Sequence, residues 1–292
     1  MIILIGSCIV MLSVFGGFVL LGGHIFALAQ MAELLIIGGA GFGAMIIMAP
    51  RNVLIDLALQ VARSFRGARY SKSSYEDLFK ALYELFLTAR RNGMITLEEH
   101  IMNPENSPIL KKYPSFLKNQ KGLALLCGAL RPIIDGKVKP DQLRFLLETE
   151  LDALEEEHHK PVSVLAKTAD AMPGFGIVAA VLGIVITMSS IAGPIEQIGH
   201  HVAAALVGTF LGILISYGFL NPLAVNMEFL GYSDSLYSKC IATSVIGFAN
   251  GMAPIMAIEL ARRGLSSELR PSADELETLL KSTATARPAP AK

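Results

Sequence analysis

Long apolar stretches interrupt an otherwise polar chain and predict four membrane spans. The first covers residues 2–21 without a charged side chain, and the second extends from about Leu34 to Pro50. Two more cover residues 173–191 and 202–223. Because about 20 apolar residues cross the hydrocarbon of a bilayer, we read each run as a transmembrane helix. The expected fold class is all-α, a polytopic membrane protein with four transmembrane helices.

The polar stretches between and after these runs predict helical domains. Apolar positions recur at helical spacing in the stretch between the second and third spans, and no strand-like alternation is sustained. The expected organisation is a transmembrane hairpin, an inserted cytoplasmic helical domain, a second hairpin, a cytoplasmic helical tail and a disordered C-terminus. In that order, the segments are residues 1–50, 51–170, 171–224, 225–281 and 282–292.

Local signals predict several helix ends in the inserted domain. A helix with apolar positions at residues 75–86 is expected to stop at Gly93. Thr96 followed by Glu99 has the spacing of a capping box and predicts the start of the next helix. A separate helix is expected over Pro140–Glu157, ahead of the third span.

One further apolar run, residues 241–258, competes for the role of a fifth span. It contains Gly247, Asn250 and Pro254, and a fifth crossing would move Arg262 to the outside. We therefore predict a buried helix of the tail.

The distribution of charge orients the spans. All 25 Lys and Arg residues lie within residues 51–167 and 239–292, and none lies in the short connections inside the two hairpins. By the positive-inside rule, the inserted domain, the tail and both termini are cytoplasmic. The net charge of zero gives no reason to expect nucleic acid as a partner. The four apolar runs make membrane lipid the expected environment.

No arrangement of side chains in the sequence points to catalysis or to a metal. The pairs His158-His159 and His200-His201 are adjacent, so on a helix their side chains point to different faces. The three cysteines lack the spacing of a metal or redox site. We expect no enzyme, no metal site and no cofactor.

The predicted spans carry no Asp, Glu, Lys or Arg in their interiors. Glu33 and Glu196 are placed at the outer edge, and Asp170 precedes the third span. Ionisable side chains are the usual mark of a proton path through a membrane. Either no ion is carried, or a partner supplies the titrating group.

Small residues form stripes on the third and fourth spans. At helical spacing these are Gly176, Ala179, Ala180, Gly183 and Thr187, and Ala204, Gly208, Gly212 and Ser216 with Thr209 beside them. Such stripes let helices approach closely or line a narrow passage, and the spacing leaves both readings open. Pro173 at the start of the third span and Pro222 near the end of the fourth fit either ordinary helix ends or a hinge.

Several segments together resemble the MotA/PomA family of flagellar stator proteins. They are residues 22–24 with 36–44, residues 90–98 with Asn103-Pro104, the segment MPGFGIVAAVLGIV at 172–185 and the segment LVGTFLGILISYGFLNPLA at 206–224. The resemblance covers nearly the whole chain.

The resemblance implies a stator subunit of the bacterial flagellar motor in the inner membrane. Chains of this family form a homopentameric ring around MotB, a single-span partner with a transmembrane aspartate, and the resulting proton channel drives torque on the rotor protein FliG. The implied rotor-interaction residues are Arg90, Glu98 and, as a weaker match, Glu150, the ion-pathway residues are Ala180 and Thr209, and the conformational-coupling residues are Pro173 and Pro222.

Each implied role has a simpler structural explanation. Arg90 at one helix end and Glu98 at another helix start would complement helix dipoles, which is worth roughly 0.3–1 kcal/mol apiece. Sodium-driven relatives have Thr where this chain has Ala180, so the resemblance implies that the transported ion is the proton, with sodium second. The alternative functions are an energising channel subunit resembling ExbB or TolQ, and a membrane scaffold without ion flux.

Overall fold

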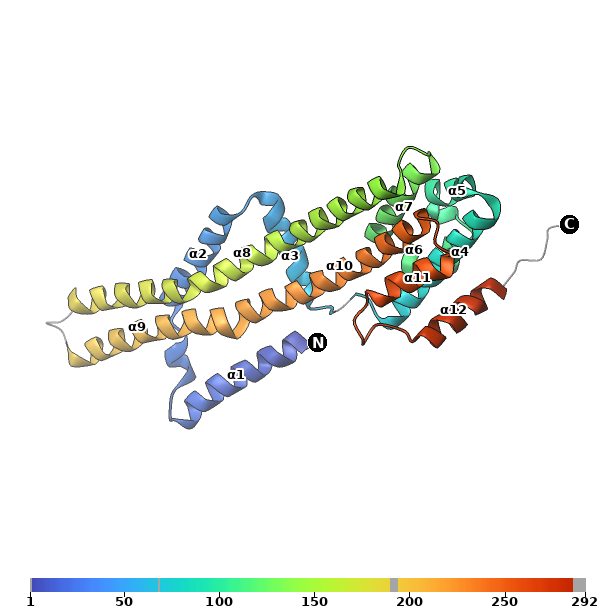
Figure 1. Ribbon diagram of the computed structural model, residues 1–292. Helices are drawn as coiled ribbons and strands as arrows, with labels where there is room; N and C mark the ends of the chain where they lie inside the picture. Colours follow the sequence, from blue (N-terminus) through green and yellow to red (C-terminus); the bar gives the residue numbers. More distant parts are fainter. Residues whose placement is uncertain (1, 68, 190–193, 286–292) are drawn as a thin grey trace. The chain divides into compact units, whose positions relative to one another are not determined.

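The computed structural model of this chain describes residues 2–67, 69–189 and 194–285. These residues form helices and contain no strand, which confirms the expected all-α class (Figure 1). Within them, four helices are long and apolar enough to cross a membrane, so the expected number of spans is confirmed.

The described helices divide into two compact units. The first, which we call the span unit, comprises Met1–Gly67 and Glu157–Gly231, and the second, the globular unit, comprises Ala68–Glu156 and Tyr232–Lys292. These limits differ from the segment limits expected from the sequence. The reason is an apolar cluster that lies beyond the predicted spans and joins the span unit, namely Leu57, Val162, Leu165, Ala224 and Met227.

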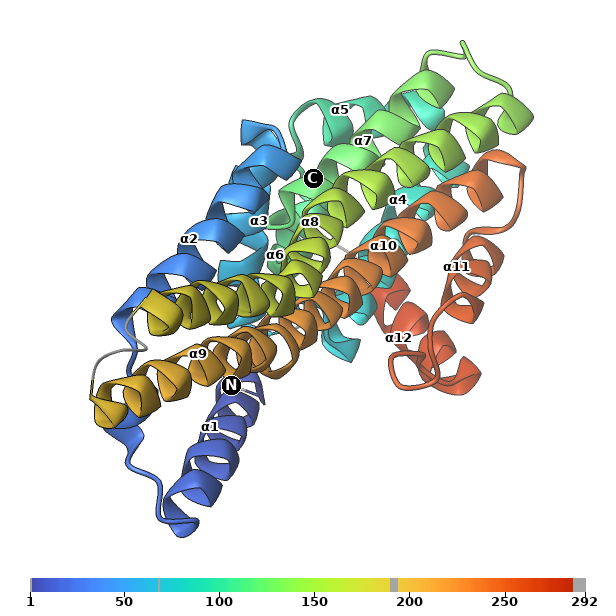
Figure 2. The same cartoon turned by 90° about the vertical axis from the view of Figure 1, so that its left-hand side faces the viewer.

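The span unit is a set of long apolar helices. They are α1 (Ile2–Leu20), η1 (Ile25–Leu28), α2 (Met31–Met48), α3 (Arg51–Ser64), the second part of α8 (Pro140–Ser189), α9 (Ile195–Ile215), the π turn η5 (Ser216–Leu220) and the first part of α10 (Asn221–Ala249). Within this unit α8 and α9 lie side by side (Figures 1 and 2). No residue of α1 is buried, which fits a helix whose apolar surface faces lipid or another chain.

The globular unit is built around helix α4. Its elements are α4 (Lys72–Asn92), η2 (Met94–Thr96), α5 (Leu97–Met102), η3 (Pro104–Asn106), η4 (Leu110–Lys112), α6 (Pro114–Leu117), α7 (Gln120–Ile134), the remaining parts of α8 and α10, α11 (Pro254–Arg263) and α12 (Ala273–Thr285). The expected apolar face of α4 is confirmed, because its large side chains are fully buried: Tyr75, Leu78, Phe79, Leu82, Leu85 and Phe86.

A large stability effect is expected at Phe86 in this core. Its ring stacks on that of Phe248 with centroids 4.3 Å apart. Truncation to alanine in a close-packed interior costs about 3–5 kcal/mol. Phe86→Ala should therefore lower the thermal unfolding midpoint of the purified protein in detergent, followed by circular dichroism. Ile95→Ala, at a residue that is 74% exposed, is the control and should leave the midpoint unchanged.

Two expected helix ends have different outcomes. Helix α4 does stop at Gly93, which has a φ of +91° that suits glycine. The helix start predicted at Thr96 is confirmed, because α5 begins at Leu97, but the capping box is wrong, because Thr96 has helical dihedral angles and closes the short turn η2. Its hydroxyl donates to the carbonyl oxygen of Gly93 at 2.6 Å, so it is not available to cap α5.

Three further boundaries are corrected by helices that continue or break. The helix expected over Pro140–Glu157 continues through the third span to Ser189. The run 241–258 is buried in part, as expected, but a turn between Ala249 and Pro254 divides it between α10 and α11. Residues 282–285, expected to be disordered, belong to α12, and residues 286–292 lie outside the described residues.

Candidate functional sites

Helices α8 and α9 approach each other through their small residues. A β-carbon added to Gly212 would lie 2.7 Å from the carbonyl oxygen of Met172 and 3.0 Å from the Cα atom of Gly176. A β-carbon on Gly183 would lie 2.9 Å from the Cβ atom of Ala205. These distances leave no room for a larger side chain, so the stripes form a packing seam between the two helices.

The predicted ion-pathway residues lie beside this seam, and one has an unused polar group. Ala180 on α8 and Thr209 on α9 are half-buried. Thr187 donates its hydroxyl to the carbonyl oxygen of Gly183 at 2.8 Å, the usual bond of a threonine inside a helix. The Thr209 hydroxyl has no hydrogen-bond partner among the described residues. It is therefore free to bind a water molecule or an ion.

Pro173 lies inside α8, so the expectation that a helix begins at this residue is wrong. Helix α8 is continuous and contains Pro161 as well. A proline in a helix interior removes one backbone hydrogen bond and costs about 3 kcal/mol. Membrane helices tolerate this because neighbouring groups compensate the freed carbonyl. The coupling role of Pro173 stays a prediction.

Pro222 is the second residue of α10, so the reading that it terminates a helix is wrong. The preceding turn η5 is a π turn, in which the backbone N–H of Asn221 donates to the carbonyl oxygen of Ser216. Since Pro222 has no N–H, the chain continues through this wider turn into α10. Asn221 also donates from Nδ2 to Oδ1 of Asp170 at 3.2 Å, which joins α10 to α8 next to both prolines.

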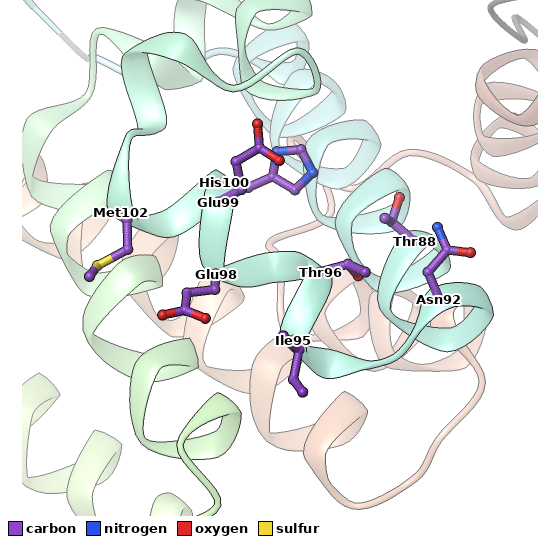
Figure 3. Close-up of a pocket in the computed structure, with 8 residues that line it drawn as sticks. All are labelled: Thr88, Asn92, Ile95, Thr96, Glu98, Glu99, His100 and Met102. Carbon is purple, nitrogen blue, oxygen red and sulfur yellow. The ribbon is translucent and has the colours of Figure 1, made fainter. Parts of the chain in front are cut away.

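A surface pocket of about 530 Å³ in the globular unit contains Glu98. Figure 3 shows the lining side chains from the end of α4, from η2 and from α5, namely Thr88, Asn92, Ile95, Thr96, Glu98, Glu99, His100 and Met102. His100 is buried with Nδ1 2.9 Å from Oγ of Ser107, and burial lowers the pKa of its imidazole. His100 is thus a neutral structural group, and the exposed Glu98 and Glu99 make the pocket acidic.

The structure places Arg90 and Glu98 on neighbouring elements, the end of α4 and the start of α5. Both side chains are exposed, and neither forms an ion pair within the part of the chain that the structure describes. The Nη1 atom of Arg90 donates to the carbonyl oxygen of Gly251 at 3.3 Å. Glu150 is exposed on another helix, α8, and does not line the pocket.

Comparison with known proteins connects this geometry to a family. Residues 4–93 match the family model described as motility protein A N-terminal, and residues 116–227 match the MotA/TolQ/ExbB proton channel family. Motility protein A of Salmonella typhimurium is 40% identical over 277 residues, which are 95% of this chain and 94% of that protein. The chain belongs to the motility protein A family. The Escherichia coli motility protein A is 39% identical, with the same coverage of 95% and 94%.

Solved structures share the fold of this motility protein A family member. A structure of Campylobacter jejuni MotAB superposes with a TM-score of 0.76 at 19% identity, covering 93% of this chain and 98% of the other. The structure of the flagellar MotAB stator complex from Bacillus subtilis superposes with a TM-score of 0.72 at 22% identity. The match covers 91% of this chain and 97% of the other. Family membership makes this chain a flagellar stator subunit of the proton channel type, a multi-pass protein of the bacterial inner membrane.

One ionisable side chain at the start of a span is buried, which the sequence pattern did not predict. Glu33, expected at the outer edge, lies in the first turn of α2 and is 6% exposed. Its Oε2 atom is buried and has no hydrogen-bond partner in the described part of the chain. Hydropathy along α2 cannot reveal this burial, because it results from packing against α9. The side chain of Glu196 lies outside what the structure describes.

Proposed function

We propose that this chain forms a homopentameric ring around a MotB-like, single-span partner, and that the complex conducts protons to turn the rotor through FliG. The observation that carries the proposal is the free hydroxyl of Thr209 beside the tightly packed α8–α9 seam. The related solved structures are MotAB complexes, which supports a MotB-like partner for this chain.

A titrating group from the partner is supported by the composition of α8 and α9, which supply no ionisable side chain beside Thr209. Residues 1–50 and 168–238 contain no Lys or Arg that would repel a cation, and residues 171–195 and 202–227 contain no Asp or Glu. A transmembrane aspartate of the partner would take up the proton and release it on the other side. Each proton then delivers about 2.3 kcal/mol per 100 mV of membrane potential.

Ala180 favours protons over sodium as the transported ion. A sodium ion must exchange its hydration oxygens for protein oxygens, and the methyl side chain of Ala180 offers none. Swimming should therefore be independent of external sodium when the proton-motive force is held constant. Swimming speed measured over a series of sodium concentrations tests this, and a loss of speed in sodium-free medium would contradict it.

The rotor-facing surface is assigned to Arg90 and Glu98, with Glu150 as a weaker candidate. An exposed cation and an exposed anion on adjacent elements, both without an ion-pair partner in the described chain, can engage opposite charges on FliG. Pro173 and Pro222 would couple ion binding to this surface, since each lies within a helix that belongs to both units. In this arrangement the globular unit and both termini are cytoplasmic, as the positive-inside rule predicts.

The assembly is tested by purifying an affinity-tagged form of the chain from flagellated cells. We expect a single-span protein with a transmembrane aspartate to co-purify with it. Native mass spectrometry of the complex should give five copies of this chain. Purification of this chain alone, or with a component of an outer-membrane uptake system, would overturn the proposal in favour of an ExbB- or TolQ-like subunit.

The ion path is tested by removing the hydroxyl at Thr209 while keeping its shape. Thr209→Val should reduce proton flux through the reconstituted complex several-fold, by about five to ten times, measured with a pH-sensitive dye inside liposomes. Thr187→Val is the matched control, because the Thr187 hydroxyl is already bound to the carbonyl of Gly183. Equal flux through both variants would show that the free hydroxyl has no part in conduction.

A further inference from the structure

Glu33 is a buried carboxyl group without a partner inside the span unit. Only 6% of the residue is exposed, and the Oε2 atom forms no hydrogen bond with the described residues. The sequence has no Lys or Arg in residues 1–50 or 168–238. An ionisable side chain inside a membrane span is the usual mark of a proton path.

The neighbours of Glu33 place it at the α8–α9 seam. A β-carbon added to Gly208 would lie 3.4 Å from Cγ of Glu33, 3.1 Å from Cβ of Ala179 and 3.5 Å from the backbone nitrogen of Ala180. The absence of a side chain at Gly208 therefore makes room for Glu33 beside Ala180. Thr209, with its free hydroxyl, is the next residue along α9.

Glu33 also lies far along α9, although it follows the short connection of the first hairpin. Gly208 is 13 residues beyond Ile195, the first residue of α9, and a helix rises about 1.5 Å per residue, so it is roughly 20 Å along the axis. Glu33 therefore meets α9 in the interior of the span, at the level of the predicted ion-pathway residues.

We propose that Glu33 is a second proton-binding station of the channel, which receives protons from the outside and passes them through water toward the carboxylate of the partner. The Glu33 carboxylate accepts a proton from a hydrated proton, forming one O–H bond. That bond breaks when the proton moves to a water molecule next to Thr209, which returns Glu33 to its charged form. This assignment rests on the proposed function and adds to it a residue from this chain.

The test uses the complete stator complex, this chain with its partner, in liposomes. Glu33→Gln keeps the size of the side chain but cannot exchange a proton, and it should lower proton flux at least about tenfold. Glu33→Asp keeps the exchangeable group and should retain flux within about threefold. Glu228→Gln is the control, because Glu228 is an exposed acid of α10 in the same unit; it should behave as the wild type.

A second measurement separates proton binding from a purely structural role. Difference infrared spectra of the complex, recorded between a neutral and an acidic buffer, should contain a carboxylic-acid C=O band that is lost in Glu33→Gln and shifted in Glu33→Asp. A band that persists unchanged in Glu33→Gln, or wild-type flux through that variant, overturns the role of Glu33 alone. Absence of flux through the wild-type complex, whose partner carries its aspartate, overturns the proposed channel as well.

Discussion

Arg90→Glu is expected to abolish swimming while the stator complex still assembles. The side chain is exposed, and the hydrogen bond that it makes is the one to the carbonyl oxygen of Gly251. Such a bond contributes about 0.5–1.5 kcal/mol, which is small compared with the stabilisation from the buried apolar side chains of α4. Reversal of the charge therefore leaves the fold intact but inverts the charge offered to the rotor. Swimming speed and the amount of variant in purified complexes are the two measurements.

Arg91→Glu is the matched control for this prediction. Arg91 is also exposed and occupies the same last turn of α4, so both reversals perturb the helix dipole to the same extent, about 0.3–1 kcal/mol. A dipole role for Arg90 predicts equal defects in both variants, whereas rotor contact predicts a defect for Arg90→Glu alone. Normal swimming of cells with the Arg90→Glu variant would show that Arg90 is not part of the surface that contacts the rotor.

Gly212→Val is expected to prevent a stable α8–α9 hairpin and hence motility. The new side chain would meet the backbone of Met172 and Gly176, which cannot rotate away as a flexible side chain could. Overpacking of this kind costs typically about 1–3 kcal/mol and more where backbone must move. We expect a lower thermal midpoint of the purified complex in detergent, reduced incorporation into stators and no swimming.

The control for the hairpin is Gly199→Val on the same helix. Among the described residues, no atom outside the backbone of its own helix and its two chain neighbours lies within 4 Å of a β-carbon built on Gly199, and the residue is exposed. The intrinsic cost of valine in a helix is the same at both positions. A thermal midpoint that falls equally in the two variants would mean that close approach of α8 and α9 is not what Gly212 provides.

The spans and the core of the globular unit could be predicted because their residues repeat with a clear period. Runs without charge identify the membrane helices, and the apolar positions of α4 recur every three or four residues. Element ends were predicted less well. A capping box at Thr96 requires extended dihedral angles at that residue. The turn that begins at Gly93 places Thr96 in a helical conformation, in which its hydroxyl donates to the preceding carbonyl oxygen of Gly93.

The reading of Pro173 and Pro222 as ordinary helix ends fails for a different physical reason. Rules for proline come mainly from helices in water, where the lost hydrogen bond and the ring clash end a helix. In α8 the helix continues through Pro161 and Pro173, and before Pro222 the chain widens by one residue. A local pattern cannot show which of these solutions the surrounding helices favour.

The candidate ion path was predictable only at the level of residue types. Small residues at helical spacing indicated that α8 and α9 approach closely, and the structure has this seam. The free hydroxyl of Thr209 and the burial of Glu33 depend on which neighbours each side chain meets across helices. Neither property can be predicted from the sequence of a single helix.

The π turn at Ser216–Leu220 holds one residue more than an α-helical turn, because its hydrogen bond closes over five residues and not four. One residue fewer in this stretch would close an ordinary α-helical turn and leave the later side chains of α10 on the faces that they occupy now. A deletion just after it, at Leu223, would instead rotate those side chains by about 100° about the axis, and the buried Ala224 and Met227 would leave their apolar cluster. The wide turn is therefore a position at which the chain can lose one residue and keep the orientation of α10.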